Sequence, residues 1–230
     1  MVKEFNDYYG EKYAKNHYTG ILGKFTNNYH QQLERNYDQE DRFQSVLEIG
    51  GGTGEHLRYV SHRFEEYAIV DISTKAQENL VIPSHISSEK VKFILGDASK
   101  LQIESKSYDR VIASCVLHHI PNLESAAMEI RRVARDGAIL DFYVPCDPGI
   151  LYRWVRHWTS HFKQRRLMDL SWREVKYLWA TEHRNHYLGV MFTIREIFSE
   201  DEIIVRRFPI PFFSWNFNLF TIVRIKISNG

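Results

Sequence analysis

The sequence predicts an α/β protein with one domain, built on a doubly wound, mainly parallel sheet of seven strands. Short apolar segments alternate with longer amphipathic segments between residues 45 and 144, which is typical of parallel strands joined by helices. After residue 190, one helical pattern precedes two alternating segments that suit an antiparallel hairpin. A chain of 230 residues can bury the core of such a domain.

Five parallel strands are expected at 45–49, 66–71, 91–95, 108–114 and 138–144. Helices are expected from the glycine-rich segment to about Phe64, from an N-cap at Ser73, and over 121–135. Right-handed crossovers then cover both faces of the sheet. The third helix carries one apolar face, formed by Leu123, Ala126, Ala127, Ile130 and Val133.

The predicted organisation is a single domain over 1–230. Residues 1–40 form an aromatic-rich helical lid, and residues 41–146 form the core. Residues 147–188 are a helical insertion before the last helix. Residues 189–230 hold that helix, at 190–200, and the closing strands, at 202–210 and 218–227.

Composition excludes several classes of function. The formal net charge is +1, which does not favour a nucleic-acid partner. No apolar segment is long enough for a membrane span, and the start does not resemble a secretory signal. Cys115 and Cys146 lack metal-ligand spacing and do not indicate a disulfide framework. We therefore expect a cytoplasmic protein, and we keep a homodimer open.

A glycine-rich segment, Gly50–Gly54, joins the first strand to a helix, which is a nucleotide-binding arrangement. The dinucleotide pattern G-x-G-x-x-G fails because Glu55 stands at its last position, and the Gly-Lys-Ser/Thr of a P-loop is absent. The form present is E-x-G-x-G-x-G, beginning at Glu48. It resembles the first motif of the class I S-adenosylmethionine-dependent methyltransferases.

Later motifs extend this resemblance over about residues 40–145. Asp71 ends the second strand, where an acid suits the two hydroxyls of a ribose, although it could also cap the next helix. Asp97 ends the third strand, where the family uses an acid toward the adenine amino group, although it could also form a turn. The segments 108–121 and 132–137 resemble the following motifs, with Arg135-Asp136 where Pro-Gly is commoner.

The resemblance implies a Rossmann-like fold, S-adenosyl-L-methionine as cofactor, and methyl transfer. The N-terminal tyrosines are similar to the family's lid helix over the cofactor, although ordinary packing would also explain them. The expected cofactor contacts are Tyr13, Tyr18, Glu48, Gly50, Gly51, Gly52, Gly54, Asp71, Ile72, Asp97, Ala98 and Ser114.

Histidines supply the candidates for a general base. His118 and His119 follow the fourth strand at the carboxyl edge of the sheet, although they could instead contact the cofactor or pack the turn. On a helix, Glu182 and His186 would share one face and line an acceptor pocket. A surface role and a metal role are alternatives for this pair, and no metal site is expected.

The insertion is basic and aromatic. Between Leu151 and Lys176 the sequence has seven Lys or Arg residues and two acidic residues, so an anionic acceptor is one interpretation. The aromatic rings of the insertion could also stack on sugars. The alternative is an amphipathic covering helix. Its buried residues would be Ile150, Leu151, Trp154, Val155 and Trp158.

We therefore expect methyl transfer to a small molecule, most favourably to the hydroxyl of a sugar or related metabolite. The turn Pro145–Gly149 and the run Glu182–His186 resemble methyltransferases that modify bacterial surface sugars, which implies polysaccharide biosynthesis. The alternatives are an N-methyltransferase acting on a small amine and a non-catalytic protein that binds S-adenosylmethionine. The N/D-P-P-Y motif of base and amide methylation is absent after the fourth strand.

Overall fold

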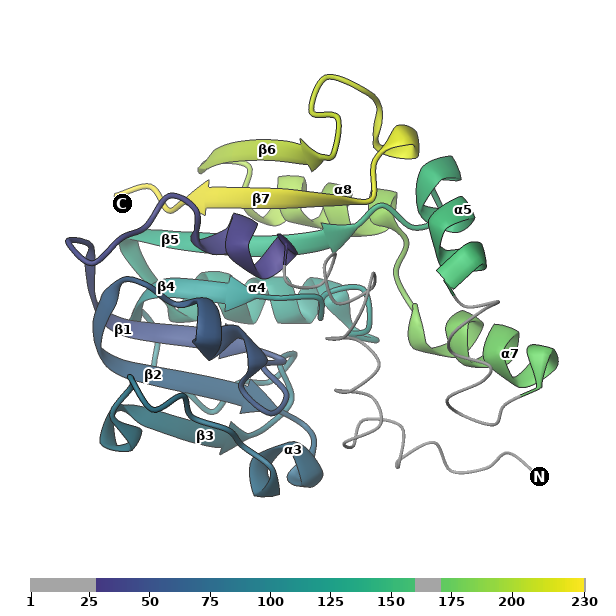
Figure 1. Ribbon diagram of the computed structural model, residues 1–230. Helices are drawn as coiled ribbons and strands as arrows, with labels where there is room; N and C mark the ends of the chain where they lie inside the picture. Colours follow the sequence, from purple (N-terminus) through teal and green to yellow (C-terminus); the bar gives the residue numbers. More distant parts are fainter. Residues whose placement is uncertain (1–27, 160–170, 230) are drawn as a thin grey trace.

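The computed structural model describes residues 28–159 and 171–229, and a seven-stranded sheet forms its centre (Figure 1). The described part of the chain begins in helical residues at 28–34. The elements that follow are β1 (Arg42–Ile49), η2 (Glu55–Tyr59), β2 (Arg63–Asp71), α3 (Thr74–Glu78), η3 (Ser88–Lys90), β3 (Val91–Leu95), β4 (Tyr108–Ala113), α4 (Leu123–Val133), β5 (Ala134–Pro145), α5 (Ile150–Thr159), α7 (Trp172–Glu182), α8 (Tyr187–Ile197), β6 (Glu202–Phe208), η5 (Trp215–Phe217) and β7 (Phe220–Lys226).

The strand order is β3-β2-β1-β4-β5-β7-β6. β1 to β5 pair in parallel, and β7 pairs antiparallel with both β5 and β6. The chain leaves β1 for β2 and β3 on one side and returns through β4 and β5 on the other. The sheet therefore has a topological switch point between β1 and β4, where open α/β sheets bind ligands. The predicted fold class and the closing hairpin are confirmed.

Strand residues alternate between two apolar cores. Leu47, Val111 and Leu140 face the side covered by α4 and α8, and all five predicted apolar positions of α4 are buried there. Val46 and Ile112 face the opposite core, which the helix at 28–34 closes. Because each β-strand turns successive side chains to opposite faces, near-continuous apolar strands require cover on both sides.

The helix expected from the glycine-rich segment to Phe64 is wrong in length. Only the single 3-10 turn η2 forms, and Val60 is already extended. β2 begins at Arg63, three residues before the predicted start, because Arg63 pairs with Arg42 and its amide donates to the Asp41 carbonyl. β1 also starts earlier than predicted. Its parallel pairing with β2 therefore takes up the residues that a longer helix would need.

The insertion places α5 and α7 beyond the carboxyl ends of the parallel strands (Figure 1). The expected burial of its apolar helix face is wrong for Ile150, Trp154 and Trp158, which are all more than half exposed. Leu151 and Val155 are half-buried, because a different side of α5 meets η5. An apolar stripe at helical spacing marks one face but does not say which neighbour, if any, covers it.

Two further expectations concerned the cysteines and membrane-spanning helices. Both cysteines are free thiols, as their spacing predicted. Within the described ranges, no helix is long and apolar enough to cross a membrane.

Candidate active site

The glycine-rich loop lies at the switch point, directly after β1. Gly50, Gly52 and Gly54 have φ angles of +64°, +54° and +83°, in the left-handed region that side chains disfavour. A Cβ on Gly50 would lie 2.2 Å from Cγ2 of Val116, in the turn after β4. The loop backbone at Gly50 therefore packs directly against the Val116 side chain, which leaves no room for a side chain at this position.

Glu48 supports this loop from the interior. Its carboxylate is fully buried and accepts hydrogen bonds from the Tyr67 hydroxyl and the Ser114 hydroxyl, each at 2.9 Å. Burial raises the pKa of Glu48 above its ordinary value. A Cβ on Gly51 would lie 2.9 Å from the carboxyl carbon of Glu48, so the acid lies directly against the loop backbone.

Asp71 lies across the switch point at the end of β2. Its Oδ2 accepts from the Gly52 amide at 3.0 Å, and its Oδ1 accepts from the Ser73 amide at 2.9 Å. Carboxylate oxygens carry further lone pairs, so this half-buried acid can also accept from a pair of ribose hydroxyls. The Ile72 side chain is 76% exposed beside it and offers an apolar surface to a flat ring. Ser73 is the N-cap of α3, as predicted.

The remaining expected cofactor residues lie nearby or outside the described ranges. Asp97 is exposed after β3, and its Oδ1 accepts from the amide and the hydroxyl of Ser99, both at 2.8 Å. Ala98 is buried behind it. Tyr13 and Tyr18 fall outside the residues that the structure describes.

This geometry is that of an α/β protein whose switch point suits a nucleoside-type cofactor. The glycine loop, where a Cβ on Gly50 or Gly51 would overlap its neighbours, and the acid of β2 fit the backbone approach and ribose of S-adenosylmethionine. Residues 47–142 match the family model of the methyltransferase domain. The match implies S-adenosylmethionine as the cofactor of this stretch.

Curated proteins with sequence similarity include very different enzymes. A polyketide synthase-nonribosomal peptide synthetase of Aspergillus flavipes is 26% identical over 159 residues, which is 64% of this chain and 4% of the synthetase. A sterol 24-C-methyltransferase of Debaryomyces hansenii is 26% identical over 149 residues, which is 62% of this chain and 39% of that enzyme. The chain thus spans far less than the full length of these relatives.

Solved structures share the fold at low identity. One is from the Haloferax volcanii complex between the Trm112 methyltransferase activator and a methyltransferase, with TM-score 0.64, 12% identity, and coverage of 100% of this chain and 98% of that chain. Another is an S-adenosylmethionine-dependent methyltransferase of Thermotoga maritima, with TM-score 0.63, 16% identity, and coverage of 99% and 100%. They confirm the fold class, including the seven-stranded, mostly parallel sheet.

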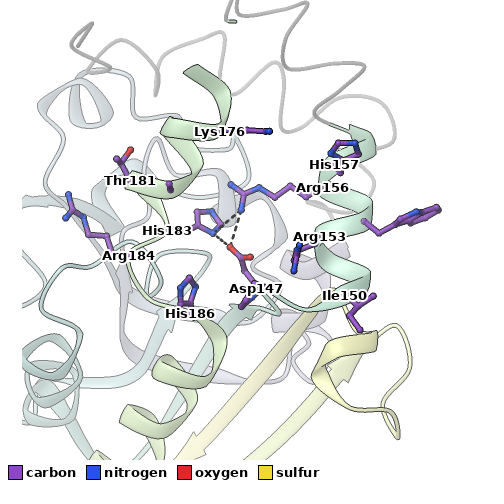
Figure 2. Close-up of a pocket in the computed structure, with 13 residues that line it drawn as sticks. Asp147, Ile150, Arg153, Arg156, His157, Lys176, Thr181, His183, Arg184 and His186 are labelled. Atoms are coloured by element: carbon purple, nitrogen blue, oxygen red, sulfur yellow. Dashed lines mark hydrogen bonds and ion pairs between the residues drawn. The ribbon is translucent and has the colours of Figure 1, made fainter. Parts of the chain in front are cut away.

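A second region of the site is a pocket of about 1210 Å³ between α5, α7 and the α7–α8 connection (Figure 2). Four of its lining side chains are Lys or Arg, three are imidazoles, and one is a carboxylate. These are Arg153, Arg156, Lys176, Arg184, His157, His183, His186 and Asp147. Three basic residues from the 151–176 part of the insertion, Arg153, Arg156 and Lys176, therefore lie on one concave surface.

At the inner wall, Arg156 and His183 point toward Asp147 (Figure 2). Asp147 Oδ2 lies 2.6 Å from His183 Nδ1 and 3.2 Å from a terminal guanidinium nitrogen of Arg156. Burial alone would raise the pKa of Asp147, but His183 and Arg156 hold it below its ordinary value. The same Nδ1 lies 3.2 Å from the Arg156 guanidinium, but its shorter contact is to the carboxylate, which only accepts, so we assign the hydrogen to Nδ1 of His183. The sequence interpretation missed Asp147 because nothing beside it in the sequence indicates the pairing.

The predicted helix through Glu182 and His186 is also wrong. α7 ends at Glu182, and residues 183–186 form an irregular connection to α8. Asn185 causes this break, because its amide donates to the His118 carbonyl and its side chain donates to the carbonyls of Leu117 and Ile120. These three bonds attach the connection to the turn after β4.

The three histidines proposed as bases differ in whether they line the pocket. His186 is exposed and lines the pocket, whereas His118 and His119 are not among the lining residues. His118 is 2% exposed, and burial holds its pKa well below the ordinary value. The His119 Nδ1 donates to the Glu182 carbonyl at 2.7 Å.

The pocket and the glycine loop are connected by the β4 turn. Val116 of this turn lies against Gly50, and Asn185 attaches the pocket wall to the same turn at His118. The glycine loop and the pocket wall are therefore both attached to the turn after β4.

Proposed function

We propose that this protein transfers a methyl group from S-adenosylmethionine to a hydroxyl of a small, anionic, sugar-like molecule. The single observation that supports this acceptor class is the basic pocket, with four Lys or Arg side chains against one carboxylate. Trp154 adds an exposed aromatic surface to the same wall, and such faces stack on sugar rings. The attachment of the pocket wall to the turn after β4 supports an acceptor position near the cofactor loop.

Each part of the reaction has residues to carry it out. When bound, S-adenosylmethionine supplies an electrophilic methyl group, and the protein aligns the acceptor and excludes water. Arg153 and Arg184 line the pocket and would hold the acceptor's anionic group. We assign proton acceptance to His186, because it is the sequence-proposed base that lines the pocket.

A small amine is the main competing acceptor. An ammonium group would be repelled by the four cationic side chains, and among the described lining residues only Asp147 could attract it. That carboxylate is already engaged by Arg156 and His183. The pocket charge therefore favours a hydroxyl on an anionic molecule over an amine.

The test measures methyl transfer from labelled S-adenosylmethionine to two matched acceptors, glucuronic acid and glucose. We expect the acid to be preferred at least about tenfold in kcat/KM, the equivalent of about 1.4 kcal/mol. The substitution Arg153→Gln should raise KM for the acid and leave S-adenosylhomocysteine binding unchanged. Lys226→Gln is the matched control, because this exposed residue lies on β7 opposite Ile139, at the other end of the sheet.

Added salt should also weaken binding of the acid, because screening reduces attraction between partly exposed charges. Equal turnover of the two sugars, or an acceptor affinity that salt does not change, would contradict a charge-based acceptor site. Preference for a small amine would replace the proposal with its competitor.

A further inference from the structure

Three imidazoles meet at the boundary between the core and the insertion. His118 and His119 come from the turn after β4, and His183 comes from the α7–α8 connection. The ring centroid of His118 lies 3.9 Å from that of His119 and 4.6 Å from that of His183, and the last two are 5.2 Å apart. One ligand nitrogen from each ring lies within 4.8 Å of the other two.

The three nitrogens are spaced more widely than the ligands of an occupied metal centre but belong to rings that can turn toward one point. Zn–N bonds of about 2.0–2.1 Å in a tetrahedral site place neighbouring ligand nitrogens about 3.4 Å apart. Small rotations of the imidazoles would therefore bring all three nitrogens within bonding range of one ion. Because His118 and His183 are far apart in the sequence, only the fold brings the set together.

Hydrogen bonds orient two of the rings as metal ligands are oriented. The His119 Nδ1 donates to the Glu182 carbonyl at 2.7 Å, and the His183 Nδ1 donates to Asp147 Oδ2 at 2.6 Å. In each of these two rings the hydrogen is on Nδ1, which leaves the lone pair on Nε2. Metal-binding histidines nearly always donate their other ring nitrogen to a carbonyl or carboxylate in this way.

His118 supplies an independent observation. Its side chain is 2% exposed, and its Nδ1 is buried without a hydrogen-bond partner among the residues that the structure describes. A buried polar atom in this state destabilises the fold by about 1–3 kcal/mol. Coordination through Nδ1 would satisfy this atom.

We propose that His118, His119 and His183 bind one divalent transition-metal ion of the zinc type, with Asp147 as the positioning residue for His183. Three neutral imidazoles are suitable ligands for such an ion and leave a fourth position open. Arg156 lies 3.2 Å from the Asp147 carboxylate, which offsets the repulsion of its charge toward a cation. The ion would join the insertion to the β4 turn, whichever acceptor the protein uses.

The test is zinc binding by the full-length chain, freed of metal with a chelator and titrated against a chromophoric competitor. We expect one Zn²⁺ per chain, and Co²⁺ in its place should give visible absorption bands of a low-coordinate nitrogen site. His183→Ala should weaken binding by about 100-fold or more, and Asp147→Asn by about 10–100-fold. His85→Ala is the control, because His85 is an exposed histidine outside the cluster.

His118→Ala could disturb the buried turn, so His119→Ala, at a half-buried position, provides a second variant in the β4 turn. Binding of S-adenosylhomocysteine verifies that each variant is folded. Absence of stoichiometric zinc in the unaltered protein overturns the proposal. Unchanged zinc affinity in folded His119→Ala and His183→Ala proteins does so as well. Because no acceptor is present, neither result depends on the proposed reaction.

Discussion

His62 is a buried imidazole in the core beneath the helix at 28–34. Its ring packs edge-on against Tyr37, Phe43 and Phe64, and its Nε2 lies 3.8 Å from a Glu34 carboxylate oxygen. Burial and then the nearby Arg110 charge lower the pKa of His62 to about 4, and these effects outweigh the attraction of Glu34. The folded protein therefore keeps this imidazole neutral at pH values where the unfolded chain is protonated.

This shift predicts a pH-dependent free energy of unfolding. Between about pH 6.5 and pH 4 the unfolded state binds the extra proton, so stability is full above this window and is lost as pH falls through it. At pH 5 the loss from His62 should be about 2 kcal/mol. Denaturant unfolding from pH 7.5 to pH 5 should show a shallower pH slope in His62→Leu than in the unaltered protein. Parallel slopes, or an equal change in the exposed His85→Leu, would rule out this assignment.

At the scale of elements, the loop between β1 and η2 and the turn after β4 fit together through one glycine. A Cβ at Gly50 would overlap Val116, and the φ angle of +64° disfavours any side chain. α8 offers a matched contrast, because a Cβ at its exposed Gly189 would meet nothing within 4 Å. Comparing substitutions at Gly50 and Gly189 therefore distinguishes the effect of a constrained backbone from the effect of replacing a glycine anywhere in the chain.

We expect Gly50→Ala to cost about 1–3 kcal/mol through its backbone angle and about 1–3 kcal/mol more through overlap with Val116. Calorimetry should show S-adenosylhomocysteine binding weakened by tenfold or more (about 1.4 kcal/mol). Gly189→Ala should bind normally and be about as stable or up to 1 kcal/mol more stable, because alanine favours helix. Normal cofactor binding by Gly50→Ala would show that the loop tolerates displacement from Val116.

At the scale of the whole molecule, a buried ion network holds distant segments together. Arg110 of β4 is fully buried and contacts Glu34 in the helix at 28–34 and Asp141 of β5. Arg224 of β7 also binds Asp141, and the Tyr37 hydroxyl donates to the same carboxylate. Two arginines thus face two carboxylates. Burial alone would raise the pKa of Glu34, but Arg110 and a histidine hold it well below its usual range.

Glu34→Gln should destabilise the fold by about 3–5 kcal/mol, because it leaves one buried positive charge uncompensated. The matched control is Asp136→Asn, which removes an exposed partner of Lys106 and should cost less than about 1 kcal/mol. Chemical unfolding of both variants provides the comparison. Equal stability of the two variants would show that Asp141 alone neutralises Arg110.

The sequence alone does not predict this ion network. Arg110 stands within an apolar strand, where its burial could not be inferred without knowing that Glu34 and Asp141 approach it. Similarly, helical spacing grouped Glu182 with His186, but tertiary hydrogen bonds from Asn185 ended the helix. Local periodicity carries no information about such long-range partners.

By itself, the sequence determined the sheet, its closing hairpin and the cofactor class, because strand–glycine–helix signals are contiguous and their chemistry is local. Only the tertiary structure decided which side chains form the pocket and the three-imidazole cluster. The three interacting residues come from separate segments: Asp147 from the turn after β5, Arg156 from α5, and His183 from the α7–α8 connection. They meet because parallel strands deliver their carboxyl ends to one edge, where the insertion packs.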